Sequence, residues 1–327
     1  MPLDSGAWSW GDVEYRSTTH LGRDCVVANG SAVVVADVSL TEGAIEVELC
    51  VARERAFHGL VWRVRDEENY ESFFVRPHQV GNPDAVQYTP VFNGISSWQL
   101  YHGPGFWAPI AFPLDEWFGI RVVFQRARAE MYVGDLDKAA LVSELKAPVD
   151  PGRVGLLIGG PDVHLAEFSY DGAVSLRGPA PAPLEVQSGV LRDWEVSDAF
   201  AEDEREEALG GQRTWTALAS EPSGLVNLAR VQGIVDRRNT VIARTTIHSP
   251  GAQTQRLELG FSDRALVFLN GRALYDGDDT YRSRDYRFLG TIGWYDALHL
   301  PLEEGANELA VVVSEDFGGW GVQARLV

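Results

Sequence analysis

Apolar and polar residues alternate with the two-residue period of a β-strand over much of the chain. In Leu60–Arg65 the even-numbered residues are all apolar, and Tyr70–Arg76 continues the same kind of alternation. The polar cluster Asp66–Asn69 between them suits a turn, because short polar side chains bond to nearby backbone groups. Two alternating runs joined by a short polar turn predict an antiparallel hairpin.

Further strand-like runs follow one another, and no long stretch has helical periodicity. In the first half they are Ala32–Val38, Ala44–Val51, Glu116–Gln125, Arg128–Gly134, Val154–Gly159 and Ala166–Asp171. In the last third they are Leu225–Val231, Asn239–His248, Gln255–Phe261, Arg264–Asn270, Asp296–Leu300 and Glu308–Val313. This pattern predicts an all-β protein built from two β-sandwich (jelly-roll) domains.

The clearest boundary is Arg177–Pro183, with the sequence RGPAPAP. Proline fixes the backbone and removes a hydrogen-bond donor, so this stretch predicts a stiff, extended linker. We therefore expect domains at residues 1–176 and 184–327, with residues 177–183 between them. The acidic stretch Ser197–Leu209 is expected to be a solvated loop or a short surface helix.

The formal net charge is −19 and the pI is about 4.7. This argues against binding to nucleic acid or to anionic membranes, both of which require a cationic surface. The N-terminus lacks the features of a secretory leader, and no apolar run is long enough to span a membrane. We expect a cytoplasmic protein, with a secreted protein that has lost its leader as the alternative. Oligomeric state stays open.

The two cysteines, Cys25 and Cys50, lie on strand-like segments and are expected to be reduced, buried thiols. Their spacing matches no metal motif. The acidic turn Asp276–Asp279 is expected to be solvated, although oxygen-rich turns of this kind can bind calcium. We predict neither a metal nor a cofactor.

Several segments of the first half carry a resemblance to a known fold. They are FHGLVWRV at Phe57–Val64, NYESFFVR at Asn69–Arg76, DEWFGIRVVF at Asp115–Phe124, GRVGLL at Gly152–Leu157 and AEF at Ala166–Phe168. Their order resembles the concanavalin A-like, laminin-G-type jelly rolls that also occur in laminarinase-type glucanases. The resemblance implies a fold and little about chemistry.

The last third carries a second resemblance. Its segments are RALVFLNG at Arg264–Gly271, EEGANEL at Glu303–Leu309 and GGWGVQARL at Gly318–Leu326. They resemble the galactose-binding-like jelly-roll domains attached to glycoside hydrolases. Trp320 is expected to anchor the core, and the mixed loop Tyr281–Arg287 has residues suited to a polar ligand.

Aromatic and planar polar residues gather on loops rich in Gly and Pro after the predicted hairpin. Such residues can hold a sugar, because ring faces stack on its C–H groups and planar polar groups meet its hydroxyls. The predicted ligand-binding residues are Arg63, Arg76, His78, Gln87, Tyr88, Asn93, Trp98, Tyr101 and His102. We expect them to cluster at one rim of the first domain. The leading hypothesis is a carbohydrate-binding protein with a saccharide as its partner.

Two alternatives stay open. One is a glycoside hydrolase or lyase, with His78 or His102 as base and Arg63 or Arg76 as an anion clamp. The paired carboxylates of the laminarinase motif are missing, which argues against hydrolysis, and no catalytic residue is assigned. The other alternative is a structural or assembly module, in which the same residues are core residues, surface ion pairs or partner contacts.

Overall fold

A computed structural model describes residues 1–179 and 186–327, and it confirms the all-β fold class. Its helical segments are the short 3₁₀ turns η1 (Pro77–Gln79), η2 (Glu202–Glu204), η3 (Ala208–Gly210) and η4 (Leu228–Arg230). None of the helices in these two ranges is long and apolar enough to cross a membrane. Residues 180–183 of the predicted linker lie outside the described residues.

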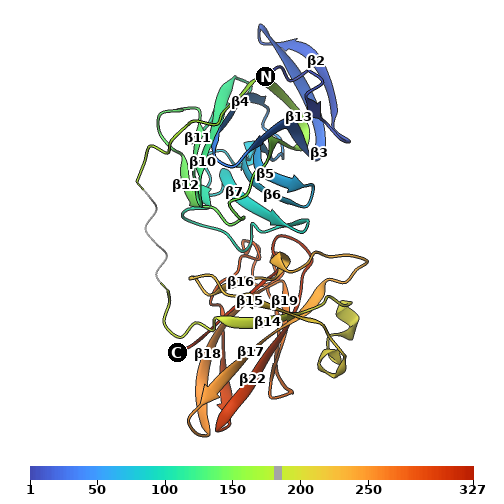
Figure 1. Ribbon diagram of the computed structural model, residues 1–327, viewed down its shortest axis with the longest axis vertical. Coiled ribbons are helices and arrows are strands. Elements are labelled where there is room, and N and C mark those ends of the chain that lie inside the picture. The colour runs from blue at the N-terminus through green and yellow to red at the C-terminus, as the bar shows by residue number, and fades with distance from the viewer. Residues whose placement is uncertain (180–185) are drawn as a thin grey trace. The chain divides into compact units, whose positions relative to one another are not determined.

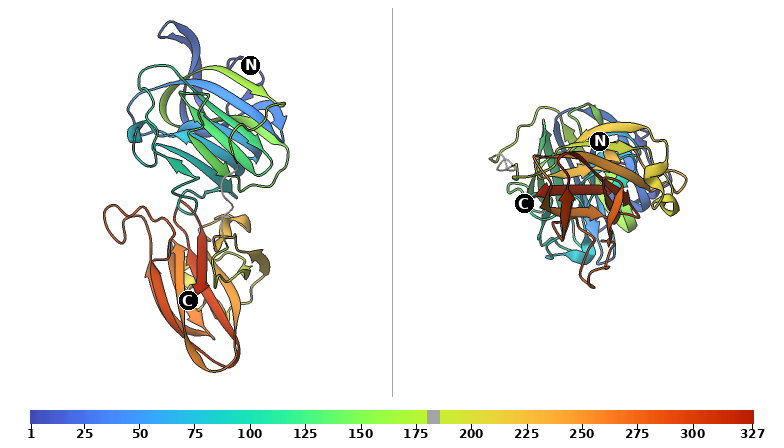
Figure 2. Two further views of the ribbon diagram at one scale, coloured as in Figure 1. Left: turned by 90° about the vertical axis from the view of Figure 1, so that its left-hand side faces the viewer. Right: turned by 90° about the horizontal axis from the view of Figure 1, so that it is seen from below.

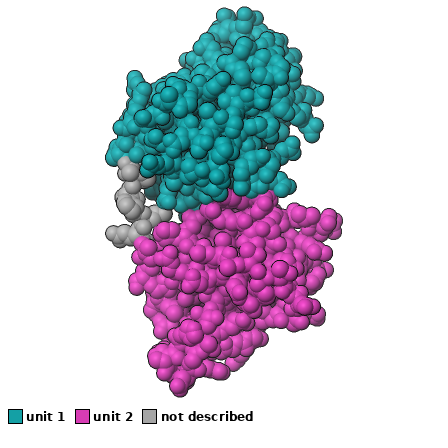
Figure 3. Space-filling model, viewed as in Figure 1, with its two compact units in different colours: residues 1–91, 101–182 teal, residues 92–100, 183–327 magenta. Residues whose placement is uncertain are grey.

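The chain forms two compact units (Figure 3). Unit 1 comprises residues 1–91 and 101–182, and unit 2 comprises residues 92–100 and 183–327. Strand pairing within each unit is antiparallel wherever the structure describes it. Each unit is described below by itself.

Unit 1 is built from strands that curl around one core (Figure 1). They are β1 (Trp8–Ser9), β2 (Glu14–His20), β3 (Arg23–Leu40), β4 (Gly43–Val51), β5 (His58–Asp66), β6 (Asn69–Val75), β7 (Val86–Phe92), β9 (Trp107–Ala108), β10 (Phe118–Gln125), β11 (Arg128–Val133), β12 (Leu141–Glu144) and β13 (Gly152–Asp171). Two predicted strands, Val154–Gly159 and Ala166–Asp171, are thus parts of one long strand, β13.

The long strands β3 and β13 join the two layers of unit 1. Strand β3 pairs with β13 from Gly152 to Leu165, while β5 pairs with the first half of β13 and β4 with its second half. At Gly155 the two long strands approach so closely that a Cβ would lie 2.0 Å from the Val34 carbonyl oxygen. Strands β4, β10, β11 and β12 continue one layer, and β5, β6, β7 and β9 continue the other.

The core of unit 1 draws on both layers. It includes Ile45, Leu49, Leu60, Trp62, Phe73, Ile120, Phe124 and Phe168, all buried. The thiols of Cys25 and Cys50 are free and buried.

The predicted hairpin is β5–β6, but its alternation breaks at Arg63. Here the backbone has φ of +50°, and the register shifts between Trp62 and Asp66. A bulge of this kind turns the following side chain to the other face. Val64 therefore packs with Val61, and not with Trp62 as the sequence pattern implied.

Unit 2 is a sandwich of two sheets, whose orange and red strands lie side by side in Figures 1 and 2. One sheet has the order β15-β14-β17-β22-β19-β20 and the other β16-β23-β18-β21. The strands are β14 (Asp193–Ser197), β15 (Trp215–Ala219), β16 (Leu225–Asn227), β17 (Thr240–Ser249), β18 (Gln253–Ser262), β19 (Arg264–Leu269), β20 (Arg272–Asp278), β21 (Asp296–Leu302), β22 (Gly305–Ser314) and β23 (Gly321–Leu326). Trp320 is buried, as predicted, and its Nε1 donates to the Val313 carbonyl at 3.0 Å.

The segment Phe92–Leu100, which contains β8 (Ile95–Ser96), belongs to unit 2 although it follows β7. Gln99 is buried there. Its backbone N–H donates to Gly318 O at 2.8 Å, and its amide nitrogen donates to Leu289 O at 2.9 Å. Its carbonyl accepts from Ile292 N at 3.0 Å. The segment thus supplies a buried part of unit 2 from within the sequence of unit 1.

The stretch Ser197–Leu209 contains the two 3₁₀ turns η2 and η3 and no α-helix. Six acidic residues crowd this stretch, and like charges three or four residues apart destabilise a helix.

Candidate functional site

Four strands of unit 1 bring their ends together at one edge of a layer. His58 pairs with Val75, Val75 pairs with Val86, and Val86 pairs with Ala108. The residues beside these pairs therefore become neighbours, although they are far apart in sequence. They are Phe57 before β5, Arg76 after β6, Asp84 before β7 and Trp107 in β9.

We call Phe57, Arg76, His78, Asp84, Gln87 and Trp107 the Arg76 cluster. At its centre, Nη1 of Arg76 forms an ion pair with the Asp84 carboxylate and lies 3.3 Å from the Asp84 carbonyl oxygen. Turned so that its amide oxygen faces them, Gln87 accepts from Arg76 Nη1 at 3.2 Å and from Trp107 Nε1 at 3.3 Å. One guanidinium, one carboxylate and one amide thus meet at a single point.

Aromatic rings flank this polar centre. The Arg76 guanidinium carbon lies 5.5 Å from the centroid of the Phe57 ring, and Phe57 is half-buried. Trp107 is half-buried as well. The cluster therefore offers partly open rings next to hydrogen-bonding groups.

The loop that carries Arg76 and Asp84 is fixed by its own backbone. Arg76 N donates to Ala85 O at 2.9 Å, and Asn82 N donates to Gln79 O at 2.9 Å. A site on such a loop loses little conformational entropy when a ligand binds.

His78 lies on η1 beside the same ring, with its centroid 5.5 Å from that of Phe57. Burial, together with the positive charges of Arg76 and Arg55, holds the pKa of His78 below its ordinary value. Its buried Nδ1 has no hydrogen-bond partner within the described residues. The lowered pKa favours the neutral form of the His78 imidazole.

The structure brings four of the nine predicted residues together. Arg76, His78 and Gln87 belong to the cluster, and His102 adjoins it through a ring contact of 5.8 Å with Trp107. The prediction missed Phe57, Asp84 and Trp107. Because strand pairing places them there, only the register of β5, β6, β7 and β9 could have found them.

Arg63 does not face a ligand site. It is 2 % exposed, and its guanidinium donates to the Arg126 carbonyl and lies 5.8 Å from the Phe124 ring. Burial lowers the pKa of Arg63. The interpretation that Arg63 points across a concave face is wrong, because the bulge turns it inward.

Tyr88 and Tyr101 are also buried. The Tyr88 hydroxyl donates to the Glu71 carboxylate and accepts from Lys146 N at 2.8 Å. Tyr101 packs against Phe106, with ring centroids 5.4 Å apart. Both are parts of the packed interior of unit 1.

Asn93 and Trp98 lie in unit 2. Asn93 Nδ2 donates to Ala229 O at 2.7 Å, and the Trp98 ring lies 6.1 Å from the Phe317 ring. The nine residues therefore do not form one cluster on the first sandwich.

No protein-family model matches the chain, and no curated protein matches it. Among solved structures it is similar to a carbohydrate binding module, CBM66, from Bacillus subtilis, at 12% identity over 50% of this chain and 95% of that chain, with a TM-score of 0.41. It is also similar to domain 4 of AbnA, an extracellular arabinanase from Geobacillus stearothermophilus in complex with arabinotriose (12% identity, 50% of this chain, 78% of that chain, TM-score 0.30). A third is a heptameric SAP-like pentraxin from Limulus polyphemus (11% identity, 49% of this chain, 75% of that chain, TM-score 0.28). Likeness at this level says nothing about the ligand of this chain.

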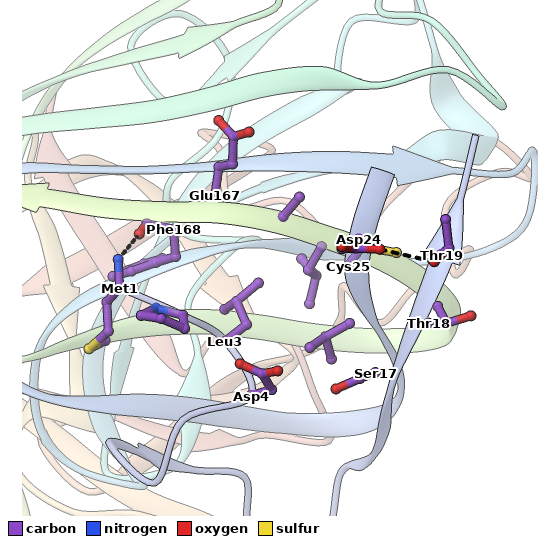
Figure 4. Close-up of a pocket in the computed structure, with 14 residues that line it drawn as sticks. Met1, Leu3, Asp4, Ser17, Thr18, Thr19, Asp24, Cys25, Glu167 and Phe168 are labelled. Carbon is purple, nitrogen blue, oxygen red and sulfur yellow. Dashed lines mark hydrogen bonds between the residues drawn. The ribbon is translucent and has the colours of Figure 1, made fainter. Parts of the chain in front are cut away.

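A cavity of about 690 Å³ in unit 1 shares no residue with the Arg76 cluster (Figure 4). Its lining combines the apolar side chains of Leu3, Val26 and Leu165 with the carboxylates of Asp4 and Asp24. Its aromatic residue, Phe168, is 1 % exposed and offers no open ring face. The cavity therefore lacks the stacking surface that the Arg76 cluster has.

The turn Asp276–Asp279 is not simply solvated, which corrects the expectation for Asp279. This residue is buried, accepts a hydrogen bond from Arg284, and has its pKa raised to about 6 by burial. Asp276 pairs with Arg205 at 2.9 Å. Across residues 1–179 and 186–327, no group of three or more His, Cys, Asp or Glu residues is placed to hold a metal ion.

Proposed function

We propose that the protein binds a saccharide at the Arg76 cluster. The observation that carries this is the Arg76–Asp84 ion pair and the Gln87 amide, which meet between the partly open rings of Phe57 and Trp107. A sugar presents adjacent hydroxyls, each a donor and an acceptor, next to apolar C–H faces. The cluster supplies the complement of both.

The energies favour weak, reversible binding. A hydrogen bond to a charged group contributes about 1.5–3 kcal/mol, and ring stacking adds about 0.5–1.5 kcal/mol beyond the buried area. Association entropy offsets several kcal/mol of this. We expect dissociation constants in the micromolar to millimolar range, which correspond to about −8 to −4 kcal/mol.

The geometry favours binding over hydrolysis. A retaining glycosidase needs two carboxyl groups about 5–5.5 Å apart, one of them protonated. The carboxylate that the cluster contributes, Asp84, is already paired with Arg76. The buried Nδ1 of His78 has no hydrogen-bond partner in the part of the chain that the structure describes, so no carboxylate there helps it act as a base, and its lowered pKa fits a hydrogen-bonding role instead.

The broader assignments that accompany this proposal are a laminin-G-type sandwich for residues 1–176 and a galactose-binding-like sandwich for residues 184–327. Both assignments rest on the sequence resemblance. A cytoplasmic location is proposed as well, and it rests on the features of the N-terminus described above. An assembly module is the competing function, and self-association without saccharide binding would favour it.

Arg76→Ala tests the proposal. The full-length variant and the wild type are compared by affinity electrophoresis in native gels that contain soluble glucan, xylan, arabinan, galactan or fructan. Arg76→Ala should clearly reduce retardation by the polysaccharide that the wild type binds. Arg65→Ala is the matched control, because Arg65 is an exposed arginine of the β5–β6 hairpin that bonds to Asn69 at 3.1 Å. Equal retardation of wild type and Arg76→Ala contradicts the proposal.

A further inference from the structure

Three aromatic rings meet on the surface of unit 2. The Phe317 ring centroid lies 6.1 Å from that of Trp98 and 6.1 Å from that of Tyr281. Phe317 is 53 % exposed and Tyr281 is 39 % exposed. We call Trp98, Tyr281 and Phe317 the Phe317 surface.

Buried carboxylates hold the loop that carries Phe317. The Asp263 carboxylate accepts from Asp316 N at 2.8 Å and from Phe317 N at 3.3 Å. Glu315 accepts from Gly319 N at 2.8 Å. A ring on such a loop is held in place before any ligand arrives, which lowers the entropic cost of binding.

The loop that carries Tyr281 is also fixed from within. Arg282 N donates to Phe288 O at 2.9 Å, and Ser283 N donates to Thr280 O at 2.9 Å. Arg282 is exposed, and its guanidinium carbon lies 4.9 Å from the Tyr281 ring centroid. The surface therefore has charged donors at its edge.

The apolar groups of the Phe317 surface are all aromatic rings. Four aliphatic side chains of unit 2 are also exposed, those of Val186, Ile234, Val235 and Val327, but none of them belongs to this surface. Rings with an arginine beside them match the C–H faces and hydroxyls of a sugar. Protein interfaces are enriched in rings and Arg as well, so a protein partner is the occupant that the test must exclude.

We propose that the Phe317 surface is a second saccharide-binding site, which acts by stacking and is independent of the Arg76 cluster. Its ligand is a neutral saccharide chain that lies across the rings, with its hydroxyls toward Arg282. The two sites differ in kind: the first recognises hydroxyl geometry through charge, and the second recognises an extended apolar sugar face.

The test uses the full-length chain in the same polysaccharide gels. Phe317→Ala and Tyr281→Ala are each made alone and in an Arg76→Ala background, and circular dichroism confirms that each variant folds. Each ring lost from the surface should raise the dissociation constant about tenfold, since that corresponds to about 1.4 kcal/mol. Tyr286→Ala is the matched control, because Tyr286 is 76 % exposed on the same loop and its ring centroid lies 5.2 Å from the guanidinium carbon of Arg287.

The outcomes separate the two sites. Loss of binding in Phe317→Ala but not in Arg76→Ala supports this site and overturns the proposal for the Arg76 cluster. Unchanged binding in Phe317→Ala and Tyr281→Ala overturns this site, whatever Arg76→Ala does. A third outcome also overturns this site: no polysaccharide retards the wild type, the wild type self-associates in sedimentation, and Phe317→Ala removes that association. The Phe317 surface is then a protein interface.

Discussion

The Arg76 cluster and the Phe317 surface use the same residue types in opposite arrangements. In the cluster, the carboxylate of Asp84 pairs with Arg76 beside the Phe57 ring. Under the surface, the carboxylates of Asp263 and Glu315 are buried and hold backbone N–H groups. Charge placed among rings gives directional contacts, whereas charge placed beneath rings gives a fixed shape.

The largest expected difference between the two regions is in stability. Asp263→Ala leaves the Asp316 and Phe317 amides without their acceptor, and each unsatisfied buried group costs about 1–3 kcal/mol. We expect the free energy of unfolding to fall by about 2–5 kcal/mol. Urea denaturation followed by fluorescence measures it.

Asp84→Ala is the matched variant. Arg76 keeps its contacts with Gln87 and with the Asp84 carbonyl, so we expect a loss of only about 1 kcal/mol. If Asp84→Ala costs as much as Asp263→Ala, the distinction between a ligand-facing and a supporting carboxylate is wrong.

Acid should affect the two units in opposite directions. Burial lowers the pKa of His58 in unit 1 from 6.5 to about 4, so the unfolded chain binds the proton first. Unit 1 therefore loses stability as the pH falls from 6.5 to 4.

Burial raises the pKa of Asp263 in unit 2 from 3.8 to about 6, so the folded chain binds the proton first. Unit 2 therefore gains stability as the pH falls from 6 to 4. Each effect reaches about 3 kcal/mol.

Urea denaturation between pH 4 and pH 7 checks this. His58→Gln should remove the loss in acid, and Asp263→Asn should remove the gain. Burial also raises the pKa of Glu315 next to Asp263, so part of the gain should survive in Asp263→Asn. If the free energy of unfolding changes with pH in the same direction in both variants, the prediction that acid affects the two units in opposite directions is wrong.

The smallest expected effect concerns a single ring of the Arg76 cluster. Trp107→Ala should weaken saccharide binding by about 0.5–1.5 kcal/mol through lost stacking. Trp107→Phe keeps a ring but loses the donor that faces Gln87. If Trp107→Phe binds as well as the wild type, Trp107 contributes through stacking. If Trp107→Phe binds as weakly as Trp107→Ala, Trp107 contributes through its hydrogen bond to Gln87. Titration calorimetry separates the two results.

Local patterns in the sequence predict the strands well but not the site. Alternation finds the β5–β6 hairpin, yet the bulge at Arg63 reverses the faces that follow it. Gln87 and Tyr88 are adjacent, and the sequence pattern made both of them ligand-binding candidates. In the structure they point to opposite faces of β7.

The remaining errors concern long-range contacts. Trp98 follows β7 by only a few residues, but Gln99 next to it is bonded to Leu289 and Gly318. Phe57, Asp84 and Trp107 meet only through the register of four strands. Pairing between residues far apart in the chain fixes these positions, and no local pattern contains that information.

Strand β13 imposes an order of events during synthesis. Its twenty residues pair with β3, β4 and β5, all made more than eighty residues earlier. Until the ribosome releases Asp171, those three strands have edges without their final partner. Such edges are prone to aggregate, and contacts this distant in sequence form slowly. Chaperone dependence during translation should therefore centre on unit 1 and end when β13 emerges.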